Sequence, residues 1–406
     1  MDRRLRKLWL VVWFGALWPA AGFGADMAAR ESVGRPVQQA QQLLKQKKTA
    51  EAQAKLREAA VIKDKSSYET YIVEATRASI EIEAGRYAPA LEAFDAALAT
   101  GIPATAERQQ ILLTEVQLAY QIKAYQRVVD LAGRYYREGG TDGTPRTLMA
   151  QSQYLAGDLA GAVQTIQAIA QADQSAGRKT PEPLLRALAS AESRRKNDPG
   201  YREALAQLVR AYPTKENWTE LLTVEQRVSG FPPRLVLDFY RLQLATGTVD
   251  TPEPYVSAAE LALEAGLPGE AKSVLEKGFA ANVLGKDAAG DRHRRLLTAA
   301  TRQSAEDMKA LPQLARNAAA AATGAAWDKL GDAYTSYGRD SDAIAAYEAA
   351  LKKGGLAQPD DTKLHLAVAR LRIGQVDRAR QVLATLSRGD GSAELGRLWL
   401  LQAGQS

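Results

Sequence analysis

A helix-turn-helix unit recurs along this chain, and its spacing constrains the fold more than any other feature. The clearest copy is WDKLGDAYTSYGRDSDAIAAYEAA, residues 327–350. It opens as W-x2-L-G-x2-Y, and its second half places Ala343 four residues before Tyr347. Small residues at Gly331 and Ala343 allow two helices to approach closely, and the rings of Trp327 and Tyr347 fill gaps between units. We therefore expect these residues to be structural.

The residue at the turn between the two helices aligns further copies. The turn positions are Lys47, Gly85, Lys123, Gly157, Gly266, Gly338 and Gly374. The first four lie 38, 38 and 34 residues apart, and the last two lie 36 apart. The stretch NDPGYREALAQLVRAYP resembles the second half of another copy, and residues 292–323 read as one long helix interrupted or kinked at Pro312. One hairpin cannot bury its apolar stripe alone, so stacking is required.

This pattern predicts an all-α fold, an α-solenoid of helix-turn-helix repeats. We expect a signal peptide over 1–25, an N-terminal repeat block over 33–213 and divergent helical pairs with one repeat over 214–290. A long helical spacer should follow over 291–323, and a C-terminal repeat block over 324–406. The stretches between turns are rich in Ala, Leu, Gln, Glu, Lys and Arg, which favour helix.

The first 25 residues have the layout of a secretory signal peptide. Four basic residues precede the uncharged apolar run Leu8 to Trp18, and small residues follow Pro19. The run is about half the ~20 residues that a membrane-spanning helix needs, so cleavage between Gly22 and Ala25 is expected. The sequence therefore predicts a periplasmic protein with no membrane insertion once the signal is removed.

Charge and cysteine content narrow the classes of partner. Removing the signal takes away four basic residues and one acidic residue, which leaves 49 basic and 46 acidic ones, a formal balance of +3. A chain so close to neutral gives no reason to expect nucleic acid. It contains no cysteine, so packing alone must stabilise it, and no lipid can be attached to a cysteine after the signal.

The sequence offers no pattern typical of catalysis, of a metal or of a cofactor. Its two histidines, His293 and His365, have no cysteine and no paired carboxylate pattern near them in sequence. GLPGEAKS, residues 266–273, departs from the spacing of a phosphate-binding loop and is explained as a repeat turn. We therefore expect a binding protein rather than an enzyme.

The spacing in residues 325–353 and 71–99 resembles the tetratricopeptide-repeat superfamily, and a looser resemblance extends over 33–400. The order of several segments, GFPPRLVLDFYRLQLATG among them, is similar to exported repeat proteins of Gram-negative bacteria. The resemblance implies a non-catalytic scaffold or adaptor of the cell envelope that binds a protein or peptide in a concave groove. Alternatives are an accessory factor for outer-membrane or polysaccharide transport and an enzyme of the cell wall.

The first helices of the copies that turn at Lys123 and Gly157 supply the predicted groove. The residues placed on its inner face are Gln110, Leu113, Gln117, Tyr120, Gln121, Thr147, Gln151 and Tyr154. Glutamine amides both donate and accept, so they suit the backbone of an extended peptide, and tyrosine adds apolar area with a polar tip. We expect a neutral or mixed peptide whose binding salt weakens only slightly. The alternatives are ordinary solvated helix residues here, or a groove around Asp328 and Asp332.

Overall fold

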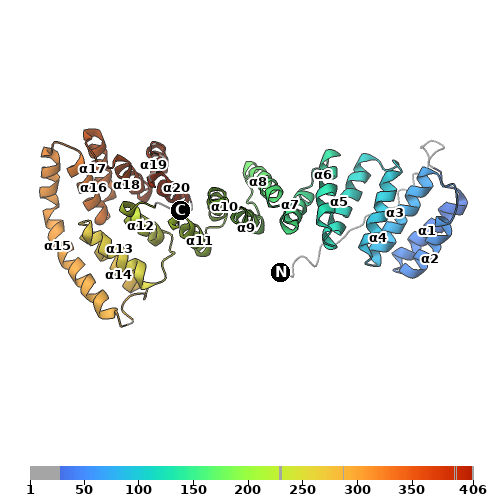
Figure 1. Cartoon of the computed structure of the whole chain (residues 1–406), viewed down its shortest axis with the longest axis horizontal. Coiled ribbons are helices and arrows are strands. Elements are labelled where there is room, and N and C mark those ends of the chain that lie inside the picture. Colours follow the sequence, from blue (N-terminus) through green and yellow to red (C-terminus); the bar gives the residue numbers. More distant parts are fainter. Residues whose placement is uncertain (1–27, 228–230, 287, 388, 390, 405–406) are drawn as a thin grey trace. The chain divides into compact units, whose positions relative to one another are not determined.

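The computed structural model describes residues 28–227, 231–286, 288–387, 389 and 391–404. Within those residues the regular structure is helical throughout, with twenty α-helices and one short 3-10 helix (Figure 1). The predicted signal peptide, residues 1–25, lies outside the described residues and stays a prediction. The chain divides into two compact units between Tyr201 and Arg202, inside α10 (Asp198–Ala211).

Unit 1 is a row of helical hairpins in which consecutive helices pack against each other. We call the first helix of each hairpin the A helix and the second the B helix. Besides the start of α10, the helices are α1 (Glu31–Lys45), α2 (Thr49–Ala60), α3 (Ser67–Glu83), α4 (Tyr87–Ala99), α5 (Thr105–Gln121), α6 (Tyr125–Arg137), α7 (Thr144–Ala156), α8 (Leu159–Ser175) and α9 (Glu182–Arg194).

The turns within the hairpins confirm the alignment made from the sequence. All seven predicted turn residues have positive φ, from 59° at Lys123 to 86° at Gly157. At Gly85 the next amide, that of Arg86, donates to the carbonyl of Glu81 at 2.8 Å, a hydrogen bond that closes the C-terminus of the A helix. Lys196 also has positive φ, at 57°, and marks a further turn between α9 and α10.

One ion pair fastens the first hairpin to the second. Ser66 and Glu69 form a capping box at the start of α3, and the Glu69 side chain is 1% exposed. Arg30, just before α1, donates to both Glu69 carboxylate oxygens at 2.8 and 2.7 Å. These hydrogen bonds lower the pKa of Glu69 to about 2. The carboxylate thus holds the start of α1 against α3.

Unit 2 contains the end of α10 and the remaining helices, and from α12 onward each helix packs against the next in the chain. They are α11 (Lys215–Gln226), η3 (Pro233–Leu235), α12 (Val236–Ala245), α13 (Pro252–Glu264), α14 (Pro268–Ala280), α15 (Gly290–Ala320), α16 (Ala325–Ser336), α17 (Asp340–Lys353), α18 (Pro359–Arg372), α19 (Val376–Leu383) and α20 (Ser392–Ala403).

The long helix expected over residues 292–323 is α15, which runs for 31 residues and includes Pro312 without a break (Figure 1). It packs against both α14 and α16. The Tyr337 hydroxyl, at the end of α16, donates to the Asp307 carboxylate of α15 at 2.7 Å. The helix therefore joins two sets of hairpins within unit 2.

The last helix folds back on the first part of unit 2. Helix α20 packs against α12 as well as α18 and α19. Arg397 of α20 donates to Glu225 of α11 at 2.8 Å and to Glu203 of α10 at 3.2 Å. The Arg397–Glu225 pair joins residues 172 positions apart in the sequence. The Glu225 side chain is only 5% exposed, so this bond lies inside the unit.

Candidate functional site

Helices α5, α7 and α9 of unit 1 lie side by side and include the helices on which the groove was predicted. Helix α5 contacts α7, and α7 contacts α9, in addition to the contacts that each makes with its B helix. We call the side of α5, α7 and α9 that carries Gln117, Gln151 and Ser190 the A-helix face. The repeated turn fixes the register, so equivalent positions of successive A helices lie next to one another.

The structure places the eight predicted residues on α5 and α7 as follows. Gln110 and Gln121 are exposed, and the other six are half-buried. Leu113 and Tyr120 also pack against the hydrophobic core of unit 1. Burial raises the pKa of the Tyr120 hydroxyl above its ordinary value, and its ring lies 6.3 Å from that of Tyr125. Leu113 and Tyr120 therefore have a structural role besides any contact with a ligand.

Gln117 and Gln151 are the half-buried amides on this face that can bond to a ligand. Each amide is half-buried, and neither bonds to another residue in the part of the chain that the structure describes. Ser190 of α9 differs, because its hydroxyl lies 2.8 Å from that of Tyr154 on α7. The two glutamines each offer two donors and an acceptor to a peptide backbone.

Helix α9 supplies residues that the sequence analysis missed. The turn at Lys196 lies 39 residues after that at Gly157, which places Ser190 and Arg194 level with Gln151 and Leu155. The Arg194 guanidinium lies 5.4 Å from the centre of the Tyr154 ring. The hydrogen bond with Ser190, together with Arg194, lowers the pKa of Tyr154 despite some burial. The signal that could have found α9 is the half-copy NDPGYREALAQLVRAYP, which places a turn just before Asn197 and a first helix ahead of it.

The alternative location, around Asp328 and Asp332 in unit 2, holds a buried ionic network. Thr362 donates to Asp328 at 2.7 Å, and Tyr347 donates to Asp332 at 2.7 Å. The Nδ1 atom of His365 lies 3.0 Å from the Asp332 carboxylate. Both carboxylates therefore have partners within the unit, so this location is a poorer candidate for a groove than the A-helix face.

His365 lies between two carboxylates that come from distant helices. Its Nε2 atom lies 3.2 Å from Asp238 of α12, a residue 127 positions earlier in the chain. Burial lowers the pKa of His365, but Asp238 and Asp332 outweigh it and leave that pKa well above the ordinary value. The sequence has no paired carboxylates near either histidine, but the fold brings Asp238 and Asp332 together at His365.

An arginine completes this network. Arg241 donates to Asp238 at 2.7 Å and makes a two-pronged contact with Glu270 of α14 at 2.7 and 2.6 Å. Its side chain is 10% exposed, and the Glu270 side chain 13%. Burial raises the pKa of Asp238, yet His365 and Arg241 hold it well below its usual range. The network links α12, α14, α16, α17 and α18, so its role is to hold these helices together.

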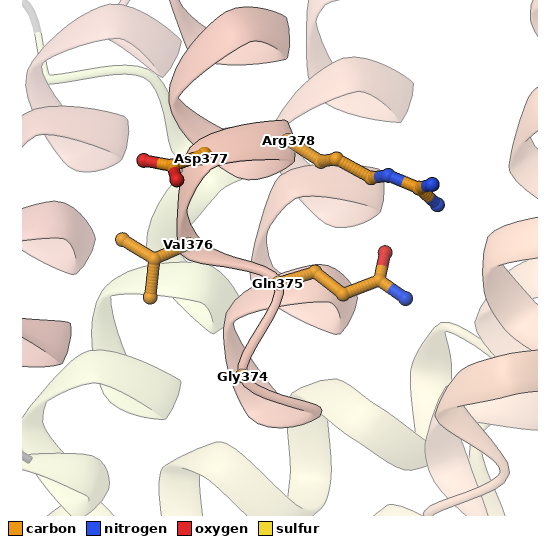
Figure 2. Close-up of a pocket in the computed structure, with 5 residues that line it drawn as sticks. All are labelled: Gly374, Gln375, Val376, Asp377 and Arg378. Carbon is orange, nitrogen blue, oxygen red and sulfur yellow. The ribbon is translucent and has the colours of Figure 1, made fainter.

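A hollow of about 350 Å³ lies at the turn between α18 and α19. Figure 2 shows its lining residues, Gly374, Gln375, Val376, Asp377 and Arg378. The Gln375 and Arg378 side chains extend to one side, whereas Val376 and Asp377 extend to the other (Figure 2). Because these groups do not converge on one point, the hollow is a repeat turn rather than a binding site.

The described residues offer neither a metal-binding cluster nor a membrane-spanning helix. Among the described residues no three His, Cys, Asp or Glu side chains are grouped so as to hold a metal ion. Within the same residues no helix combines the length and the apolar character needed to cross a bilayer. His365 has two carboxylate neighbours, but Arg241 and Tyr347 already bond to them.

Comparison with models of protein families and with curated sequences gives no match for this chain. Solved structures of similar helical architecture include Naa15/Naa10 bound to HypK-THB, at 15% identity and a TM-score of 0.29. That match covers 87% of this chain and 63% of the other, so the chain spans less than two thirds of it.

Two other structures are similar at the same level. The C-terminal part of a TPR repeat-containing protein from Cytophaga hutchinsonii has 14% identity and a TM-score of 0.30, covering 80% of this chain and 98% of its own. Yeast Tom70 has 10% identity and a TM-score of 0.26, covering 91% and 95%. Likeness this low carries no weight for function. The repeat architecture is established by the chain's own paired helices and turns.

Proposed function

We propose that this protein is a non-catalytic interaction scaffold of the bacterial cell envelope that binds a partner segment on the A-helix face of unit 1. The observation that carries the proposal is the pair of half-buried amides, Gln117 and Gln151, which neighbouring A helices present on one face without bonds to the described residues. Half-buried amides that bond to no protein group are well placed to pair with an extended backbone.

The unequal use of polar groups in the two units supports this choice of surface. In unit 2 the carboxylates of α16 are taken up by Thr362, Tyr347 and His365. In unit 1 the tyrosine and serine of the face bond to each other, but the two glutamines remain available to a ligand. A partner that bonds to both amides would gain hydrogen bonds without breaking any within the protein.

Capture from envelope extract tests the proposed surface. The double variant Gln117→Ala with Gln151→Ala should lose the partner, because it removes both amides while leaving the packed tyrosines in place. The matched control is Gln164→Ala with Gln167→Ala, since both residues are exposed on the B helix α8. If the face variant captures the partner as well as the control does, the groove lies elsewhere.

The envelope location rests on the N-terminal 25 residues and has its own test. Cell fractionation with N-terminal sequencing should find a mature chain that begins between residues 23 and 26 in the periplasmic fraction. Such a start agrees with cleavage after the apolar run. A chain that still begins at Met1 in the membrane pellet contradicts the proposed export.

A further inference from the structure

The acidic residues of the three A helices that form the A-helix face are directed away from it or already paired. Helix α7 contains no acidic residue. On α5, Glu107 accepts a hydrogen bond from the Tyr71 hydroxyl, and Glu115 is fully buried. On α9, Glu182 pairs with Arg186 at 2.8 Å. The face therefore offers a ligand no unpaired carboxylate from the helical residues that the structure describes.

Glu192, the second acidic residue of α9, pairs with Arg195 and not with the neighbouring Arg194. Glu192 is 3% exposed and bonds to Arg195 at 2.8 Å and to the Asn197 amide at 3.0 Å. Arg194, one position earlier, is exposed and has no ion pair with any described residue. Its guanidinium lies beside the ring of Tyr154.

The other arginines of these helices are also taken up. Arg108 of α5 pairs with Glu138 at 3.0 Å, and Arg146 of α7 lies 4.6 Å from the centre of the Tyr136 ring on α6. Arg146 has no carboxylate partner either, but its guanidinium lies against α6. Among the described residues, Arg194 is therefore the helical cation on the A-helix face itself that no carboxylate neutralises. A face with one free cation and no free anion is complementary to a single negative charge.

An exposed apolar side chain lies level with this cation on the neighbouring helix. Leu155 of α7 is 52% exposed, and the 39-residue interval between turns makes Arg194 its equivalent on α9. Packed helices lie about 8–10 Å apart. An extended chain advances about 3.3 Å per residue, so about three residues of a bound segment separate the two points.

On the basis of the proposed function, we propose that the A-helix face recognises an extended segment carrying an acidic side chain, which pairs with Arg194, and an apolar side chain about three residues away, which covers Leu155. The guanidinium held beside the Tyr154 ring is oriented before binding. This reduces the side-chain entropy that a free arginine loses when it forms an ion pair.

Selection of random ten-residue peptides displayed on phage, against the full chain, tests the inference. Selected peptides should be enriched in Asp or Glu, with an apolar residue about three positions away. In synthetic versions, replacing the acid by its amide should weaken binding about two- to fivefold, as for an exposed ion pair. The same replacement should have no effect on binding to Arg194→Gln.

Arg137→Gln is the matched control, because Arg137 is an exposed arginine at the end of the B helix α6. This variant should discriminate acid from amide as the parent does, and 0.5 M salt should abolish the discrimination in both. A selection without enrichment of acidic peptides overturns the inference, as does discrimination that persists in Arg194→Gln.

The same peptides separate failure of this inference from failure of the proposed function. If binding is lost in the Gln117→Ala, Gln151→Ala variant but unchanged in Arg194→Gln, the inference of an acidic segment is wrong and the proposed binding surface stands. Binding that survives the loss of both glutamines contradicts the surface itself.

Discussion

Gly331 of α16 packs directly against the ring of Tyr347 of α17. A β-carbon at Gly331 would lie 2.9 Å from Tyr347 Cζ and closer still to two other ring atoms. Tyr347 is 1% exposed and is held by its bond to Asp332, so its ring cannot move aside freely. The spacing of the unit, Leu-Gly then Ala-x3-Tyr, thus reflects a contact between the two helices of one hairpin.

Gly331→Leu should destabilise the protein by about 1–3 kcal/mol, because it overpacks this contact. Even Gly331→Ala should destabilise it, although alanine is the better helix former by about 1 kcal/mol. Chemical denaturation followed by circular dichroism measures both effects. Gly143→Ala is the control, since a β-carbon there meets nothing within 4 Å. Equal stability of Gly331→Leu and the parent would count against the hairpin assignment.

The turn residues allow a test of backbone conformation separate from packing. Lys123 has φ 59° and Gly85 has φ 70°, and both are exposed. Because a left-handed conformation costs an L-residue about 1 kcal/mol relative to glycine, Gly85→Ala should destabilise unit 1 by about that amount. Lys123→Gly should be neutral or stabilising. Thermal unfolding of both variants measures this. A Gly85→Ala variant as stable as the parent, beside a destabilised Lys123→Gly variant, would contradict the shared turn geometry.

Several features of the fold could be predicted from sequence, and others could not. Turn residues and small residues at close contacts are local, so Gly85 and Gly331 were assigned from spacing alone. Lys196 was missed because only the second half of its copy, NDPGYREALAQLVRAYP, was recognised in the sequence. The α9 contribution to the A-helix face was missed with it. The His365 network was missed because Asp238 lies 127 residues away, and no local pattern brings α12 to α18.

Glu115 gives unit 1 a pH dependence. It is fully buried, and the nearest guanidinium atom, on Arg127, lies 3.6 Å away. Burial, aided by Asp95 and opposed by Arg127, raises the pKa of Glu115 to about 8. A carboxyl whose pKa is raised by folding favours the folded state at low pH, and that stability is lost as pH rises from the unfolded pKa of about 4.3 toward 8.

Glu115→Gln should remove this slope, which is at most about 1.4 kcal/mol per pH unit, and should stabilise unit 1 most at pH 8. Denaturant unfolding of the parent and the variant at pH 5, 6.5 and 8 measures it. A constant difference between the two proteins across this range contradicts a neutral, buried Glu115.

His365 gives unit 2 a dependence in a higher pH range. Because its folded pKa is raised well above the ordinary 6.5 by Asp238 and Asp332, its contribution is fully present below about pH 6.5. That contribution is lost as pH rises through the folded pKa. The groups facing it are Asp238 and Arg241 of α12, Asp328 and Asp332 of α16, and Tyr347 of α17.

His365→Gln should therefore destabilise unit 2 more at pH 6 than at pH 9.5. Proton NMR of the imidazole in the folded parent should show titration above pH 6.5, and denaturant unfolding of both proteins gives the difference in stability. A histidine that titrates below 6.5, with a variant equally destabilised at both pH values, would mean that burial outweighs the two carboxylates.

Site-specific photo-crosslinking tests the central claim, that a partner binds the A-helix face of unit 1, most directly. A photoreactive residue would be placed in living cells at Gln117 or Gln151, and at Gln164 or Gln167 of α8 as controls. A crosslinked partner is expected from the first two positions and none from the α8 positions. Crosslinks that form from α8 and not from Gln117 or Gln151 would contradict it.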